Sequence, residues 1–173
     1  MRVNKVGACA IYQNVYVLAQ QMQLFYPVLI GALAADRKHK ISRLISNAFD
    51  KTFAAETLQG FNKAVLCQQN GDIIGVACVR ESSAHPLPTL ECVCVAAQHR
   101  RQGIAHEMIA CAQTDLGYNT LMLHIDKDNQ QLQKVQSLYR DCGFVVTRES
   151  DTELEMQWRR RQNTNNPAVQ ISI

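Results

Sequence analysis

The 173-residue sequence lacks several features that would assign it to a class at once. Its seven cysteines include no C-x-x-C pair, so the ligand spacing of a structural zinc site is missing. Its longest apolar run, Leu24–Ala35, is too short to cross a bilayer and contains Pro27. Aromatic residues make up only 6% of the chain, and the net charge of +3 is too small to indicate nucleic-acid binding.

What is present describes an ordinary globular protein, with 47% hydrophobic and 19% charged residues. We expect one domain over residues 1–158 and a polar, flexible tail over residues 159–173. Several cysteines lie inside apolar runs, where cysteine behaves as a small hydrophobe, which favours reduced thiols over a disulfide framework. The N-terminal segment has basic residues but only a brief apolar stretch, unlike a signal peptide. We therefore expect a cytoplasmic protein with no metal, no membrane and no nucleic-acid partner.

Hydrophobic spacing predicts the secondary structure of the first half. A short strand is expected at Gly7–Gln13, followed by a mostly helical region over Val15–Phe49 that Pro27 interrupts. Two β-like runs in residues 63–81 flank Asn70-Gly71, a strong signal for a type I′ hairpin turn. Residues 82–88 are expected to form a loop, and residues 89–97 a further strand.

The second half alternates helices and strands. A helix is predicted over Ile104–Leu116, with Gly117 at its C-terminal end, and a strand over residues 120–126. A second helix is expected over residues 129–142, and two paired strands over residues 144–150 and 153–158. This order predicts an α/β (α+β) fold with a mixed, mostly antiparallel central sheet and helices on both faces.

The stretch "QHRRQGIAHEMIA", residues 98–110, has the properties of an anion site. Gly103 has no Cβ, so a ligand can approach its backbone closely. The predicted helix that follows offers free N–H groups and the positive end of its dipole. Arg100 and Arg101 add donors suited to phosphate oxygens. A surface turn with solvated arginines is the alternative interpretation of the hexapeptide alone.

Three phosphate-binding motifs are candidates for this stretch, and only one of them fits its residues. A Walker loop requires G-x-x-x-x-G-K-[ST], and a dinucleotide fingerprint requires G-x-G-x-x-G; neither is present. The hexapeptide from Arg100 to Ala105 fits the pattern [Q/R]-x-x-G-x-[G/A], and "LYRDCGF" follows at Leu138–Phe144. With these two motifs and its element order, the chain resembles the GNAT superfamily of N-acetyltransferases over residues 60–158.

The resemblance implies acetyl-CoA as co-substrate and acetyl transfer directly to a primary amine of a small molecule, protein or peptide. In that family the fourth strand splays from the fifth, and the pantetheine arm of the coenzyme lies in the gap. The resemblance places the coenzyme against two segments of this chain, the strand Val93, Cys94, Val95 and the loop Arg100, Arg101, Gln102, Gly103, Ile104, Ala105. In that family an asparagine seven residues before the motif tyrosine helps to bind the coenzyme, but that position is Leu132 here. Asn129 is taken in its place, and a helix N-cap at Asn129 or Asp128 is the alternative.

Two residues are candidates for the chemistry. Tyr139 matches the family tyrosine that protonates the departing thiolate, although a core tyrosine would have the same spacing. Glu91 is the candidate general base, because strand parity places it on one face with Val93 and Val95. A solvated or ion-paired strand carboxylate is the alternative for Glu91. His124, on the next predicted strand, is a lesser candidate.

The sequence leaves the acceptor and the assembly open. By resemblance, the acceptor is selected by residues 25–40 and 147–154. Glu149, Asp151 and Glu153 would attract a cationic amine there, and a solvated turn is the alternative interpretation of these charges. A non-catalytic regulatory module that binds acetyl-CoA on the same fold is an alternative function. The oligomeric state is not determined, a homodimer being among the options.

Overall fold

The structure is a computed structural model that describes residues 22–83 and 85–161. The strands are β1 (Leu24–Leu29), β2 (Lys63–Gln69), β3 (Asp72–Ser82), β4 (His85–Val95), β5 (Thr120–Asp126), β6 (Val145–Glu149) and β7 (Glu153–Arg159). The α-helices are α2 (Ala35–Phe49), α3 (Ile104–Asp115) and α4 (Leu132–Asp141). Short 3₁₀ turns lie at Ile30–Ala32, Ala55–Gly60 and Ala97–His99. No helix among these residues is long and apolar enough to cross a membrane.

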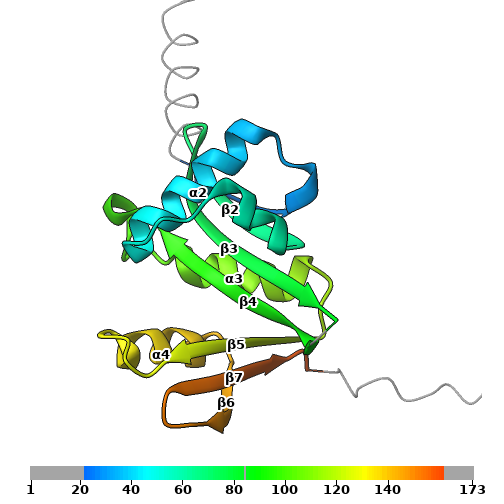
Figure 1. Ribbon diagram of the computed structural model, residues 1–173, viewed down its shortest axis with the longest axis vertical. Coiled ribbons are helices and arrows are strands. Elements are labelled where there is room, and N and C mark those ends of the chain that lie inside the picture. The colour runs from blue at the N-terminus through cyan, green and yellow to red at the C-terminus, as the bar shows by residue number, and fades with distance from the viewer. Residues whose placement is uncertain (1–21, 84, 162–173) are drawn as a thin grey trace, which may run out of the picture.

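All described strands belong to one sheet, in the order β1-β2-β3-β4-β5-β7-β6 (Figure 1). β4 and β5 run parallel, and the other neighbouring pairs in the described sheet are antiparallel. The prediction of a mixed, mostly antiparallel sheet is thus confirmed.

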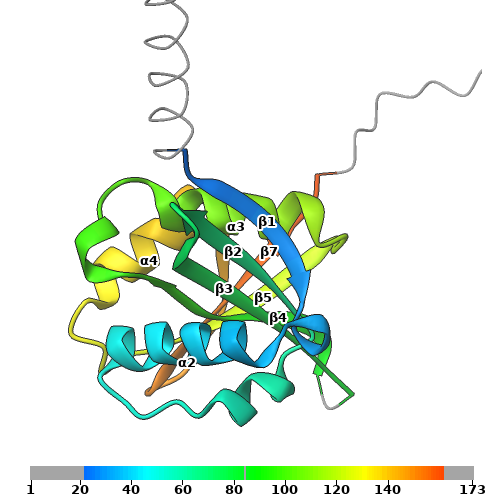
Figure 2. The ribbon, with the colours of Figure 1, turned by 90° about the horizontal axis from the view of Figure 1, so that it is seen from above.

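Helices cover both faces of this sheet, as predicted (Figure 2). α2 packs its apolar stripe of Ile41, Leu44 and Ile45 on one face, in a core shared with β2, β3 and β4. α3 and α4 pack on the opposite face, in a core that reaches from β2 to β7. Because the core under α2 contains no residue of β5, β6 or β7, no helix of residues 22–83 and 85–161 covers these strands on the α2 side.

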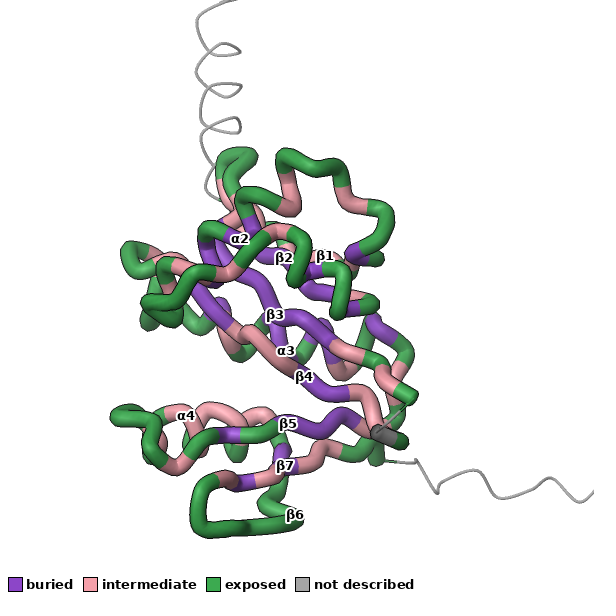
Figure 3. The backbone as a smooth tube through the Cα atoms, viewed as in Figure 1, coloured by how far each residue is buried: buried purple, intermediate pink, exposed green. Residues whose placement is uncertain are grey.

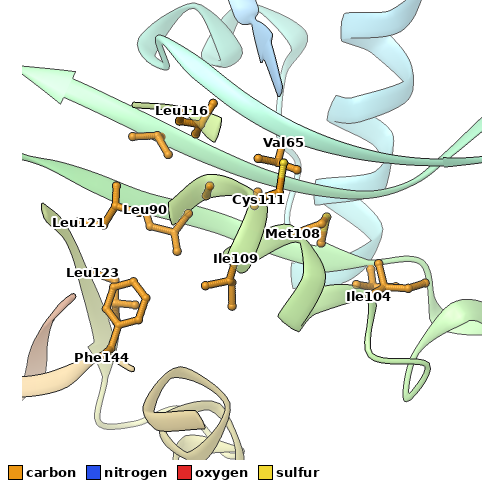
Figure 4. Packing of buried hydrophobic residues seen from close by; sticks show 14 of the residues in the cluster. Val65, Leu90, Ile104, Met108, Ile109, Cys111, Leu116, Leu121, Leu123 and Phe144 are labelled. Atoms are coloured by element: carbon orange, nitrogen blue, oxygen red, sulfur yellow. The ribbon is translucent and has the colours of Figure 1, made fainter. Parts of the chain in front are cut away.

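The core on the α3 side contains residues from strands on both sides of the β4–β5 split. Figure 4 shows Met108 and Ile109 of α3 between Val65 of β2 and the pair Leu123 and Phe144. α3 approaches β3 closely because residue 75 is glycine: a Cβ there would lie 2.9 Å from the sulfur of Met108. Leu123 and Phe144 belong to the second half of the chain, so this core joins the two halves.

The predicted hairpin is present. β2 and β3 are joined at Asn70 and Gly71, whose φ angles of 53° and 84° are the paired positive values that a type I′ turn requires. The predicted helix ends at α3 are also confirmed, since Gly103 precedes the helix at φ 79° and Gly117 follows it at φ 80°.

Three predicted elements are wrong in part. Residues 24–29 form β1 rather than a helix, and Pro27 is tolerated because β1 is an edge strand, where a missing N–H costs no ladder bond. The loop expected at residues 82–88 is mostly strand, since β4 begins at His85. α4 begins at Leu132 rather than at Asn129. The strand predicted at Gly7–Gln13 lies outside the described residues.

The sheet continues slightly past the predicted end of the domain at residue 158. β7 includes Arg159, and the Arg160 guanidinium donates hydrogen bonds to the carbonyl oxygens of Gln113 and Thr114 at 2.8 and 3.3 Å. Those carbonyls lie in the last turn of α3, which has unpaired acceptors. Figure 3 shows burial along the chain: buried residues lie along β2 to β5 and β7, whereas β6 is exposed.

Candidate active site

The two parallel strands separate almost as soon as they meet. Only Thr89 and Met122 are in register between β4 and β5, so the strands diverge toward Val95 and Asp126 (Figure 1). Backbone groups on the facing edges beyond this point have no ladder partner across the gap. This is the splay that the family resemblance implies.

A cleft of about 800 Å³ opens beside this split. Its walls come from the end of β4, the loop before α3, the first turn of α3, the segment before α4 and the inner side of α4. The cleft contains nine of the ten predicted coenzyme-binding residues, which are Val93, Cys94, Val95, Arg100, Arg101, Gly103, Ile104, Ala105 and Asn129. The tenth, Gln102, is exposed beside them, and its side-chain oxygen accepts a hydrogen bond from Gln23 at 3.2 Å.

The mouth of the cleft has the geometry of an anion site. Arg101 and Gly103 have positive φ angles of 62° and 79°, which turn the chain sharply into α3. The first intrahelical hydrogen bond of α3 is donated by Glu107, so the N–H groups before it are free, and no side chain caps them. A Cβ on Gly103 would meet nothing within 4 Å, so the backbone there is open to a ligand. These groups fit a diphosphate.

The two arginines of the loop differ in their contacts. Arg100 donates from Nε to the carbonyl oxygen of Val95 at 3.1 Å, which ties the loop to the end of β4. The Arg101 side chain is exposed at the mouth of the cleft. Arg100 therefore fixes the loop, while Arg101 provides positive charge where an anion would arrive.

Comparison with known proteins agrees with this geometry. Residues 61–146 match the family model described as an acetyltransferase (GNAT) domain. The chain belongs to the GNAT acetyltransferase family. It therefore carries an N-acetyltransferase domain.

Solved structures show the same fold at low sequence identity. Escherichia coli ElaA is 14% identical with a TM-score of 0.61, covering 79% of this chain and 99% of its own. The ribosomal-protein-S18-alanine N-acetyltransferase of Escherichia coli is 16% identical with a TM-score of 0.63, covering 83% and 98%. Diaminobutyrate acetyltransferase EctA of Paenibacillus lautus, solved with its substrate and coenzyme A, is 16% identical with a TM-score of 0.59, covering 79% and 94%. No curated protein sequence matches the chain.

In this GNAT domain a bulge in β4 changes which face Glu91 occupies. Cys78 is opposite Glu91 and Val76 is opposite Cys94, so β4 has one residue more than β3 over this span. The bulge is centred near Cys92, whose φ is 51°. Glu91 consequently lies on the α2 face, whereas Val95 packs into the core under α3. The predicted shared face is wrong, because strand parity does not survive a bulge.

Glu91 has a partner on that face. The guanidinium of Arg80 donates from Nε to one carboxylate oxygen at 2.9 Å and from a terminal nitrogen to the other at 3.2 Å. The Arg80 guanidinium also stacks over Phe61 and donates to the carbonyl oxygen of Gly60. The ion-paired interpretation of Glu91 therefore describes its contacts, and Glu91 does not line the cleft.

Tyr139 packs against the core under α3; it follows the cleft residue Leu138 but is not itself one of the residues that line the cleft. Its ring is half-buried and packs edge-on against Phe144, with 5.7 Å between the ring centres. Burial raises the pKa of its phenol, and the nearby thiols of Cys142, Cys92 and Cys94 raise it further. Its hydroxyl has no hydrogen-bond partner among residues 22–83 and 85–161. The phenol therefore stays protonated and free to donate.

Asn129 lies at the cleft but also has a local structural role. Its side-chain oxygen accepts a hydrogen bond from the N–H of Gln131 at 2.8 Å, in a turn that precedes α4. Leu132, at the usual family position of the asparagine, packs into the core under α3 instead.

Several cleft residues were not predicted from the sequence. Ala48, Phe49 and Asp50 at the end of α2 border the cleft, as do His99 and His106 beside the anion site. The α2 residues come from a region with no motif, so only the tertiary fold brings them here. The histidines flank the Arg100–Ala105 motif, so their position in the sequence could have indicated that they border the cleft.

The cysteines of the described residues are free thiols, as predicted. Burial raises the pKa of Cys94 to about 12 and that of Cys92 to about 11. Both thiols are therefore protonated at neutral pH and are poor nucleophiles. Cys94 packs in the wall of the cleft, and Cys92 packs against the core under α2.

Proposed function

We propose that the chain transfers the acetyl group of acetyl-CoA directly to a primary amine of a small molecule or peptide. The cleft beside the β4–β5 split carries this proposal. It combines free N–H groups at the start of α3, suited to the pyrophosphate, with strand edges and apolar side chains suited to the pantetheine arm. Its volume of about 800 Å³ lies within the range of small-ligand sites.

Acetyl-CoA, when bound, supplies an activated thioester. Attack by a neutral amine forms the new C–N bond and breaks the C–S bond, so one proton must leave the amine and one must reach the departing sulfur. We assign the second transfer to Tyr139, because its phenol is protonated, has no competing partner in the described chain and belongs to the inner side of α4. The first transfer is assigned to Glu91 acting through water, because Glu91 does not line the cleft but lies at the level where β4 and β5 separate.

The ion pair between Arg80 and Glu91 supports a second candidate function. A carboxylate with both oxygens engaged is a weaker proton acceptor than a free one. A regulatory module that binds acetyl-CoA without turnover would need the cleft but no base. The two functions share coenzyme binding and differ only in product.

One experiment separates them. The purified chain is titrated with acetyl-CoA by calorimetry, and is then incubated with acetyl-CoA and a panel of amines whose products are detected by mass spectrometry. We expect coenzyme binding and acetylated product from at least one acceptor class, with loss of turnover in Tyr139→Phe. Binding without product from any class would support the regulatory module, and absence of binding would refute both functions.

A further inference from the structure

A row of charged and polar side chains crosses the second half of the sheet. Arg148 of β6 is directly opposite Glu155 of β7, and Glu155 is directly opposite His124 of β5. The register of Thr89 with Met122 places Glu91 at the same level as His124 across the split. The row therefore runs from the outer edge of the sheet to the point where β4 and β5 separate.

This row lies on the α2 side of the sheet, and none of its residues lines the coenzyme cleft. Leu121, Leu123 and Ile125 of β5 point into the core under α3, so Met122 and His124 point to the other face. That face of β5 and β7 has no core packed against it within the described chain. The inner end of this row thus lies at the split of β4 and β5, beside which the coenzyme cleft also opens.

The face is hollowed by a second cavity of about 610 Å³. Its lining is polar across β5, β6 and β7 and apolar toward β4. The lining residues are Pro86, Leu87, Met122, His124, Arg148, Ser150, Glu153, Glu155 and Gln157.

Contacts within the cavity keep one carboxylate ionised. Glu155 accepts hydrogen bonds from Thr147 at 2.6 Å and from Gln157 at 3.1 Å, and its other oxygen lies 3.9 Å from Nε2 of His124. The hydrogen bond from Thr147 is the main cause that lowers the pKa of Glu155. Arg148 and Glu153 form no ion pair within residues 22–83 and 85–161. The cavity thus has a cationic group on β6, whose charge also lowers the pKa of Glu155, and carboxylates on β7.

We propose that this second cavity binds the acceptor, and that the acceptor is a small primary amine that also carries a carboxylate. Arg148 binds the carboxylate at the outer end, while Glu155 and His124 receive the amine at the inner end, next to the split. This inference rests on the proposed acetyl transfer, since it assigns the second substrate of the same reaction.

The strand spacing sets the separation of the two groups. β6 and β5 lie two strands apart, or roughly 10 Å between backbones at about 4.8 Å per strand. The Arg148 side chain shortens that gap, because a guanidinium extends several ångströms from its backbone. An amine separated from its carboxylate by several methylene groups fits better than an α-amino acid, whose two groups share one carbon.

Matched pairs of acceptors test the proposal. 6-Aminohexanoate and pentylamine differ only in the carboxylate, as do 4-aminobutyrate and propylamine. For each pair, kcat/KM is measured with saturating acetyl-CoA on the full chain and on Arg148→Gln. Arg159→Gln is the control, because it removes the same charge from an exposed position at the far end of β7.

We expect the carboxylated amines to be preferred by about tenfold or more, as a charge-assisted pair with arginine provides. Arg148→Gln should abolish this preference, Arg148→Lys should retain part of it, and Arg159→Gln should leave it intact. The acetyl-CoA dissociation constant should be unchanged in all three variants, and Arg159→Gln should also leave the kcat/KM for plain amines unchanged.

Two results would overturn the acceptor assignment while leaving acetyl transfer in place. One is equal kcat/KM within each pair; the other is an Arg148→Gln loss that is the same for carboxylated and plain amines. Failure of the proposed function looks different, because acetyl-CoA then fails to bind or no amine is acetylated. Binding of 6-aminohexanoate, followed by NMR without coenzyme, tests the cavity independently of turnover, and absence of binding would also overturn the assignment.

Discussion

Replacing Gly103 with valine tests the coenzyme site at its most specific point. Gly103 precedes α3 at φ 79°, and a Cβ there would meet no other atom within 4 Å. The free protein therefore has room for the valine side chain, and its cost to folding is conformational. A ligand that approaches the Gly103 backbone would instead meet two added methyl groups.

The conformational cost lowers the stability of the fold, whereas the clash with the ligand lowers the affinity for acetyl-CoA. Holding a non-glycine residue in a left-handed conformation costs roughly 1–2 kcal/mol, which for a domain of this size lowers the Tm by about 2–8 °C. Losing one hydrogen bond to a charged diphosphate costs about 1.5–3 kcal/mol. We therefore expect Gly103→Val to weaken acetyl-CoA binding by roughly 10- to 100-fold. Calorimetric titration measures the affinity, and thermal denaturation measures the folding cost.

Gly117 at the other end of α3 provides a matched control. Its φ is 80° and it also has open space around the Cβ position, so Gly117→Val has the same conformational cost. The two variants should lose similar stability, and only Gly103→Val should lose coenzyme affinity. Equal affinities in the two variants would refute the assignment of the α3 N-terminus as the diphosphate site.

Three further changes have defined outcomes. Tyr139→Phe should lower kcat by about tenfold or more with unchanged acetyl-CoA affinity, because it removes a proton donor and little packing; steady-state kinetics and calorimetry measure this. Thr147→Val should raise the pKa of Glu155 toward its ordinary value, as NMR titration would show. Because the pKa of Glu155 is lowered in the folded state, its carboxylate stabilises the fold above its unfolded-state pKa. That stabilisation is lost as the pH falls through the folded-state pKa, so Thr147→Val should lose less stability on acidification than the unchanged protein. Gly75→Ala should lower the free energy of unfolding by about 1–3 kcal/mol in chemical denaturation, because its Cβ would crowd the Met108 sulfur and the Cys67 Cβ.

Much of the fold could be predicted where a signal was local. Asn70-Gly71 specified a hairpin because few other dipeptides adopt two consecutive positive φ angles. The apolar spacing and flanking glycines of α3 gave its limits within one residue. β1 could not be predicted in this way, because an apolar run with one proline has no clear period and its strand state depends on pairing with β2.

In the site, too, the parts with a local signal could be predicted and the parts that depend on strand pairing could not. The loop around Gly103 is contiguous in sequence, so its motif alone located the anion site. Strand parity predicts the wrong face for Glu91, because the bulge near Cys92 depends on the register with β3 and leaves no pattern in β4 itself. The row formed by Arg148, Glu155 and His124 comes from the three strands β6, β7 and β5, so only the sheet order reveals it.

The single register pair between β4 and β5 also bears on how the folded state resists unfolding. Little backbone hydrogen bonding joins β1–β4 to β5–β7, so the shared core under α3 provides much of the connection. A ligand that fills the coenzyme cleft would contact β4 and α3 on one side and α4 on the other, and would thereby link β1–β4 to the part of the chain that contains β5–β7. By mass action, such a ligand at 100 times its dissociation constant adds about 2.7 kcal/mol to the free energy of unfolding. Substrate concentration would then set the lifetime of the protein as well as its rate of turnover.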